Sequence, residues 1–245
     1  MVPLPGRAKS TSSATIPRSA RDPLLNRSSV ATRGCNWGVL MKVLLFDSRA
    51  DLCAAWQAAF DGIASVHVHR GSFELLTGAF DCLVSPANSF ALMDGGLDAA
   101  IIDHFGISLE TRVQQEIWRV YRGEQPVGTC LMVATGKGHC PWLAHCPTMR
   151  VPTDVAWTNH AYQAFLAALT TAEATGVQRL ACSGLGTGAG HMLPDVCARQ
   201  MRFAFDCWKE PFRRSTWDAP LEREWRSYGR SKVEFLKHRF RLDHD

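Results

Sequence analysis

The feature that most constrains this chain is a polar, glycine-containing loop between a buried strand and a helix. The apolar run 80–84 predicts the strand, and residues 99–105 predict the helix. The loop contains Asn88, a glycine pair at 95–96 and Asp98. In α/β proteins, a loop at the carboxyl end of a strand that feeds a helix is where ligands bind. Its glycines let the main chain approach a ligand closely, and the helix start offers unpaired N–H groups to an anion.

A second glycine-rich loop, residues 184–190, occupies the same position in another strand–loop–helix unit. Residues 180–183 predict a buried strand before it, and Pro194 opens a helix after it. Four glycines in seven residues indicate consecutive backbone amides that curl around phosphate oxygens. One such loop is a weak signal because glycine-rich turns are common. Two in one chain favour a nucleotide-like ligand that contains a diphosphate.

These residues resemble the signatures of the macrodomain family. The order Asn88, glycine pair, then Asp98 entering a helix is similar to the family's first motif, which reads N-A-A-N, a glycine-rich stretch and V-D. Residues 184–190 resemble its phosphate loop, and residues 142–152 are similar to a segment of some bacterial and phage-type members. The resemblance covers about residues 41–210. It implies a three-layer α/β/α domain with a central mixed sheet that binds ADP-ribose.

The resemblance also implies roles for single residues. In hydrolytic macrodomains the residues that match Asn88 and Asp98 are assigned ribose positioning and catalysis. An amide can donate and accept at once, and a carboxylate in the first turn of a helix is expected to have a low pKa and to orient a water toward the anomeric carbon. The other residues that we expect to bind the ligand are Ser72, Phe73, Ala87, Gly95, Gly96, Gly184, Gly186, Thr187, Gly188, Ala189, Gly190 and His191.

The chain departs from the family pattern in three places. Where many macrodomains carry G-D-I, with the Asp contacting the adenine amino group, this chain has Gly71, Ser72 and Phe73. Ser72 brings no charge, and Phe73 is free to pack on the base. The glycine run before Asp98 is shorter than usual. Residues 189–192 contain no aromatic side chain to cover the terminal ribose, which leaves a looser site or admits a bulkier substrate.

Structural interpretations compete with these functional ones. Asn88, two residues after Pro86, could be a turn former that satisfies its own backbone. Asp98 could be only an N-terminal helix residue, with Asp94 as the cap. For His191 we favour a solvent-exposed loop histidine over a ligand contact.

The nine cysteines are scattered without a repeated spacing, which is typical of buried free thiols in a reducing compartment. The His-Cys pairs at 139–140 and 145–146 could suggest a metal site. The second pair lies in a predicted strand, where consecutive side chains face opposite ways and cannot share one ion. Cys182 is the one candidate nucleophile, and core packing is the better interpretation. We therefore expect no metal, no cofactor and a cytoplasmic location.

Strands and helices alternate from Met41 onward. The strands are expected at 42–46, 65–69, 80–85, 129–135, 143–150 and 179–183. The link between 129–135 and 143–150 is too short for a crossover, so these two are antiparallel neighbours and the sheet is mixed. Ser48 and Asp51 predict a capping box for the first helix.

The two ends of the chain differ from its middle. Residues 1–40 hold six basic residues and one acid and have no apolar period, so we expect a disordered extension, with an organelle transit peptide as the alternative. Residues 211–245 form a charged tail that adds at most one helix. No run approaches the length of a membrane span, and no charged-then-apolar leader opens the chain.

Three functions follow from these observations. The first is a monomeric macrodomain that hydrolyses a mono-ADP-ribosyl bond, and the second is an ADP-ribose reader without turnover. The third, a dinucleotide oxidoreductase, is disfavoured because residues 46–50 lack the glycine fingerprint expected after a first strand. A formal net charge of +4 gives no strong case for nucleic-acid binding, although a nucleic acid remains open as the modified acceptor.

Overall fold

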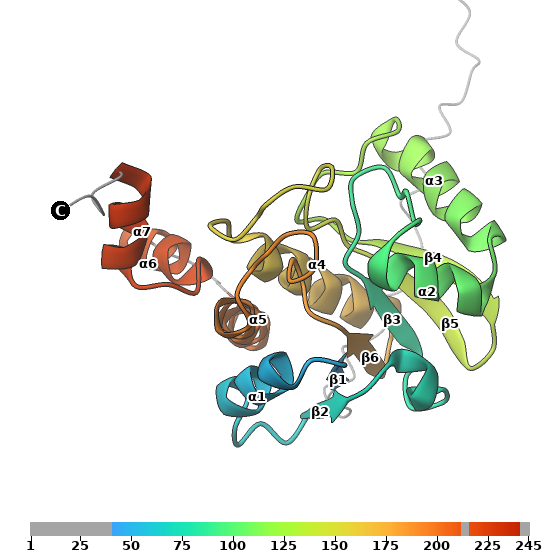
Figure 1. Ribbon diagram of the computed structural model, residues 1–245, viewed down its shortest axis with the longest axis horizontal. Coiled ribbons are helices and arrows are strands. Elements are labelled where there is room, and N and C mark those ends of the chain that lie inside the picture. The colour runs from blue at the N-terminus through green and yellow to red at the C-terminus, as the bar shows by residue number, and fades with distance from the viewer. Residues whose placement is uncertain (1–40, 212–215, 241–245) are drawn as a thin grey trace, which may run out of the picture. The chain divides into compact units, whose positions relative to one another are not determined.

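The computed structural model describes residues 41–211 and 216–240 (Figure 1). The predictions made for residues 1–40 lie outside these ranges. The strands are β1 (Lys42–Asp47), β2 (Val66–Arg70), β3 (Cys82–Ser85), β4 (Leu131–Lys137), β5 (Cys140–His145) and β6 (Arg179–Cys182). The helices are α1 (Ala50–Ala59), the short 3₁₀ helix η1 (Phe73–Leu76), α2 (Gly96–Phe105), α3 (Ser108–Tyr121), α4 (His160–Thr175), α5 (Pro194–Lys209), α6 (Asp218–Ser227) and α7 (Lys232–Phe240).

The strands form one six-stranded sheet in the order β2-β1-β6-β3-β5-β4. All neighbours are parallel except β4 and β5, which form the antiparallel pair that the short link predicted. The mixed sheet is therefore confirmed. The strand expected at 143–150 begins and ends earlier, at Cys140 and His145. Residues 146–150 still bond to the chain after β3, since Thr148 donates its N–H to the carbonyl of Ala87.

Helices cover both faces of the sheet and give the three layers that the sequence predicted. Consecutive residues of a strand point to opposite faces, and Leu83 and Val84 accordingly belong to two separate buried clusters. One cluster joins the sheet to α1, α4 and α5. The other joins it to η1, α2 and α3.

The start of α1 differs from the prediction. Arg49 is the N-cap residue, and in the described part of the chain no side chain caps the helix. The carboxylate of Asp51 accepts from the N–H of Leu52, its own neighbour, so the predicted box between Ser48 and Asp51 does not form. The carboxylate of Asp47 accepts from the N–H of Arg49 instead (2.9 Å), which fixes the chain where β1 turns into α1.

The segment after Glu210 holds two helices where the sequence suggested at most one. The Asn159 amide, just before α4, donates to the hydroxyl of Ser227 at the end of α6 (2.9 Å). The Gln200 side chain on α5 donates to the carbonyls of Thr158 and Tyr228. These buried polar contacts join the C-terminal helices to α4 and α5. None of the helices in the described ranges has the length and apolarity that a membrane crossing requires.

The cysteines of the described ranges are free, and all but Cys130 are buried. Burial raises the pKa of the Cys182 thiol well above its usual value. Cys182 is fully enclosed, so it serves core packing and is not an accessible nucleophile.

Core packing on the α4 side generates a stability prediction. Phe165 is fully buried between the sheet and the helices, so Phe165→Ala leaves a cavity and should lower the free energy of unfolding by about 3–5 kcal/mol. Trp118→Ala is the matched control because that ring is 64% exposed, and its effect should stay within about 0.5 kcal/mol. Urea unfolding measures both, and equal losses in the two variants would contradict the assignment of Phe165 to the core.

Candidate ligand-binding site

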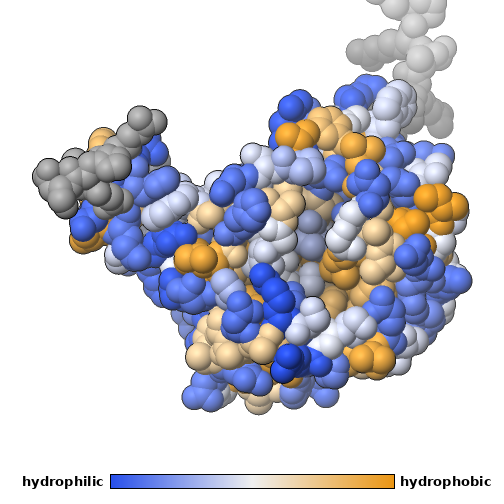
Figure 2. Space-filling model, in the orientation of Figure 1, coloured by the Kyte–Doolittle hydropathy of each residue, from blue (hydrophilic) through white to orange (hydrophobic). Residues whose placement is uncertain are grey.

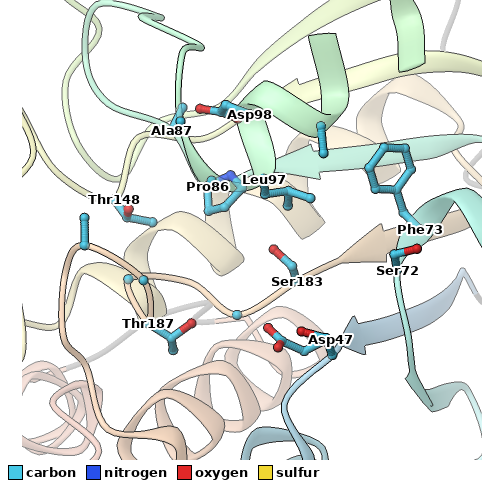
Figure 3. A pocket seen from close by; sticks show the side chains of 18 of the residues that line it. Asp47, Ser72, Phe73, Pro86, Ala87, Leu97, Asp98, Thr148, Ser183 and Thr187 are labelled. Atoms are coloured by element: carbon cyan, nitrogen blue, oxygen red, sulfur yellow. The ribbon is translucent and has the colours of Figure 1, made fainter. Parts of the chain in front are cut away.

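The two glycine-containing loops line one cavity of about 590 Å³ at the carboxyl ends of β1, β3 and β6. Figure 3 shows Asp98 across this cavity from Thr187, with Phe73 at one end. Figure 2 shows a hollow of weakly polar and weakly apolar residues near the centre of the visible face. The sequence-predicted residues that line the cavity are Ser72, Phe73, Ala87, Asn88, Gly95, Gly96, Asp98, Gly184, Gly186, Thr187, Gly188 and Ala189.

Two predicted residues, Gly190 and His191, do not line the cavity. Gly190 packs inside its own loop, because a Cβ there would stand 2.5 Å from the carbonyl oxygen of Gly186. The His191 side chain is 72% exposed and lies 3.7 Å from the Asp154 carboxylate. The solvent-exposed interpretation of His191 therefore fits the structure better than a ligand contact.

The second loop presents unpaired backbone donors. It folds on itself through bonds from His191 N–H to the Gly188 carbonyl and from Met192 N–H to the Gly186 carbonyl, each 3.0 Å. Within the described ranges, no hydrogen bond uses the N–H groups of residues 186–189. Gly186 has a φ of +71°, a conformation that glycine adopts without strain. The loop therefore lines the cavity with a run of free amides, which suits an anion.

The first loop presents a second set of free donors at the start of α2. Gly95 is the N-cap residue and no side chain of the described residues caps the helix, so neither Asp94 nor Asp98 fills that role. The first hydrogen bond of the helix runs from the N–H of Ala99 to the carbonyl of Gly95. The N–H groups of residues 96–98 therefore have no partners inside the helix. The helix dipole adds partial positive charge at the same point.

The Asn88 side-chain amide forms most of its hydrogen bonds within the turn that follows it. Its Oδ1 accepts from the N–H groups of Phe90 (3.0 Å) and Leu92 (3.3 Å), and its Nδ2 donates to the Leu92 carbonyl (2.8 Å). This turn places Ala91 at a φ of +51°. Asn88 thus behaves as the turn former that the sequence left open, while one amide N–H remains for a ligand at the cavity wall.

Asp98 is buried, 8% exposed, and accepts a 2.6 Å hydrogen bond from the Ser85 hydroxyl. Burial raises the pKa of the Asp98 carboxyl to about 6, and the Ser85 bond only partly opposes this increase. The expectation of a low pKa from the helix dipole is wrong because desolvation outweighs the dipole. The carboxyl instead exchanges a proton near neutral pH.

The structure adds residues that the sequence analysis missed. The Glu110 carboxylate on α3 accepts from the N–H of Met93 (3.0 Å), and the Gln114 amide donates to the carbonyl of Ala91 (3.0 Å). These contacts hold the first loop against α3. The buried residues of α3 recur at helical spacing, but this apolar pattern gives no sign of the two polar contacts.

A further group of missed residues lines the cavity from β1 and from the chain after β5. Asp47 is the last residue of β1, Arg49 follows that strand, and Thr148 follows β5. The predicted strand at 42–46 is the sequence feature that could have identified Asp47 and Arg49. Parallel strands bring the residues at their carboxyl ends to one edge of a sheet, where ligands bind.

Phe73 lines the cavity but is only 1% exposed. Its ring lies parallel to that of Phe105, with the centroids 6.4 Å apart, and edge-on to that of His104. Little of the ring is free to pack on a base, so Phe73 shapes the wall from within the core.

Comparison with known proteins places this geometry in a family. A sequence model of the family described as "Macro domain" matches residues 84–201. An uncharacterised protein of Aquifex aeolicus is 33% identical over 121 residues, which are 49% of this chain and 70% of the relative. The chain belongs to the macro domain family. An uncharacterised protein of Aeropyrum pernix is 27% identical over 124 residues, and this macrodomain spans 62% of its length.

Solved macrodomains are also similar to this chain, at low sequence identity. The macrodomain of Mycobacterium tuberculosis DarG is 19% identical, with coverage of 56% of this chain and 88% of that one and a TM-score of 0.48. The Trypanosoma brucei macrodomain solved in complex with ADP-ribose is 19% identical, with coverage of 52% of each chain and a TM-score of 0.40. The family match at 84–201 leaves β1, α1 and β2 outside it, although β1 delivers Asp47 and Arg49 to the cavity.

The buried carboxyl generates a pH prediction. The folded pKa of Asp98, about 6, lies above the reference value of 3.8, so the native state holds this proton more tightly than the unfolded chain does. Ionised Asp98 therefore costs stability increasingly as the pH rises from about 4 to about 6. The Asp98→Asn variant lacks this cost and should be more stable than the wild type at pH 7 by about 1–3 kcal/mol, with no difference near pH 3.

Urea unfolding of both proteins from pH 3 to pH 8 measures this difference. Asp103→Asn, on the exposed side of the same helix, is the matched control. A stability gap between wild type and Asp98→Asn that stays constant with pH would contradict the raised pKa.

Proposed function

We propose that this macrodomain binds ADP-ribose and hydrolyses a mono-ADP-ribosyl bond. The observation that carries the proposal is the convergence of two sets of unpaired backbone N–H groups on one cavity that also holds a buried carboxyl. Membership of the macro domain family supports ADP-ribose as the ligand. We also infer a monomer with a cytoplasmic location, and the free cysteines support a reducing compartment.

In the proposed complex the diphosphate accepts hydrogen bonds from the amides of residues 186–189 and 96–98. Backbone donors fixed in advance stabilise the charge without reorganising when the ligand binds. Because the two sets come from opposite walls, they bend the ligand and bring its terminal ribose toward Asp98. The free N–H of Asn88 then contacts a ribose hydroxyl.

Asp98 supplies the proton chemistry of the proposed hydrolysis. With a pKa of about 6, its carboxyl is mostly ionised at pH 7 and accepts a proton from an attacking water. The water oxygen bonds to the anomeric carbon and the bond from that carbon to the acceptor breaks. The proton taken by Asp98 then passes to the departing acceptor through solvent, which restores the carboxylate. The Ser85 hydroxyl fixes the orientation of the carboxylate through its 2.6 Å bond.

A reader without turnover is the second candidate, and one observation favours it. The Asn88 amide is largely used within its own turn, so it offers less to the ribose than a free amide would. A site of this kind still binds the diphosphate through backbone amides while leaving the water unpositioned.

Release of ADP-ribose from a mono-ADP-ribosylated acceptor, paired with calorimetry on free ADP-ribose, separates the two candidates. If Asp98 is the base, Asp98→Ala should slow release about 100-fold or more. Its effect on the affinity for free ADP-ribose should stay within about tenfold. The wild-type rate should rise with pH through the Asp98 pKa of about 6.

Asp103→Ala is the matched control and should release ADP-ribose at the wild-type rate. Unchanged release by Asp98→Ala would remove Asp98 from the mechanism. Tight binding with no release by the wild type would establish the reader, and no binding at all would refute the proposed ligand.

A further inference from the structure

Among the described residues that line the cavity, Arg49 is the only lysine or arginine. Four acids, Asp47, Glu74, Asp94 and Asp98, line it as well. A diphosphate brings further negative charge into this acidic surrounding, and like charges in a partly enclosed site repel. The position of the one cation therefore matters more than a surface arginine usually does.

The guanidinium of Arg49 connects the end of β1 to the second loop. Its Nε lies 3.5 Å from Oδ1 of Asp47, and its Nη1 donates to the carbonyl oxygen of Thr187 (3.3 Å). Nη2 is buried and has no hydrogen-bond partner within the described ranges. The guanidinium is thus held by Asp47 on one side and by Thr187 on the other. The backbone N–H of Arg49 donates to the same carboxylate of Asp47.

The contact with Thr187 fixes a peptide that the proposed ligand needs. The carbonyl of Thr187 and the N–H of Gly188 belong to one planar trans peptide unit, so they point in opposite directions. With the carbonyl turned toward Arg49, the N–H of Gly188 points away from the guanidinium and remains free as a donor. A hydrogen bond to the carbonyl from a charged donor also polarises the peptide and strengthens that N–H.

No other hydrogen bond within the described ranges reaches this peptide. The Thr187 carbonyl has no second donor, and a Cβ at Gly188 would meet no atom within 4 Å. Glycine adopts positive and negative φ with similar ease, so the peptide before Gly188 is free to flip once the Arg49 contact is lost. The flipped peptide would present a carbonyl oxygen to the diphosphate in place of an N–H.

We propose that Arg49 is a positioning residue for the diphosphate: it holds the Thr187–Gly188 peptide with its N–H available to the phosphate oxygens and offsets the acidic lining of the cavity. This inference rests on the proposed binding of ADP-ribose. It concerns a residue that lies outside the segment matched by the family.

Calorimetry with three ligands tests the inference on the full chain. In Arg49→Met the affinity for ADP-ribose and for ADP should fall about tenfold or more, while the affinity for adenosine, which lacks phosphate, should stay within about twofold. Arg49→Lys keeps the charge and one donor, and should recover part of the affinity. Arg119→Met removes an exposed cation on α3 and should leave all three affinities unchanged.

A second readout separates peptide positioning from general stability. In the ligand-free protein, the Gly188 amide signal in an ¹⁵N-correlated NMR spectrum should shift or broaden in Arg49→Met and stay close to its wild-type position in Arg49→Lys. The melting temperatures of the variants show whether the fold is intact. If Arg49→Met fails to fold, Arg49→Lys is compared with the wild type in its place.

The outcomes are distinguishable. If the wild type binds ADP-ribose and Arg49→Met binds it equally well, the inference fails and the proposed function stands. Equal losses for adenosine and ADP-ribose, or an unchanged Gly188 signal, would also overturn it. If the wild type binds no ADP-ribose, the proposed function fails and the inference fails with it.

Discussion

The site depends on the direct parallel pairing of β3 with β6. Because these two strands are neighbours and run the same way, the loops that follow them leave the sheet at one edge. Residues about 90 positions apart in the sequence, such as Gly96 and Gly186, consequently line one cavity. Each loop then feeds a helix, so each turns back over the sheet with donor groups left unpaired. Without this pairing neither loop would form more than half of an anion site.

The same edge explains why Asp98 has unusual chemistry. It stands in the first turn of α2, where the helix dipole favours its charge, yet it is enclosed between the helix and the end of β3. Burial dominates, and the single hydroxyl of Ser85 offsets only part of it. The result is a carboxyl that gains and loses a proton close to neutral pH. A carboxylate at the surface of the same helix would not serve as an effective base at that pH.

The sequence predicted the elements around the loops well, because alternating and helical apolar patterns report burial directly. It correctly placed the two loops after buried strands and the antiparallel pair of β4 and β5. It could not predict the side-chain partners. The chain entering α1 is fixed by Asp47 and not by a capping box at Ser48. The hydrogen bonds of the Asn88 amide depend on the turn geometry at Ala91. The pKa of Asp98 depends on how much of it is enclosed, which no local pattern encodes.

Arg49 shows the same limit most clearly. The sequence analysis did not single out Arg49, whose contact with Thr187 joins residues 138 positions apart. Nothing near Arg49 in the sequence indicates this partner. Long-range polar contacts of this kind follow from the strand order, in which β1 lies between β2 and β6.

Titration of ¹⁵N-labelled protein with ADP-ribose, followed through the backbone amide signals, tests the central claim most directly. If both loops hold one diphosphate, the N–H signals of residues 186–189 and 96–98 should shift together and yield a single dissociation constant. Shifts confined to one of the two loops, or different dissociation constants for the two sets, would contradict the account.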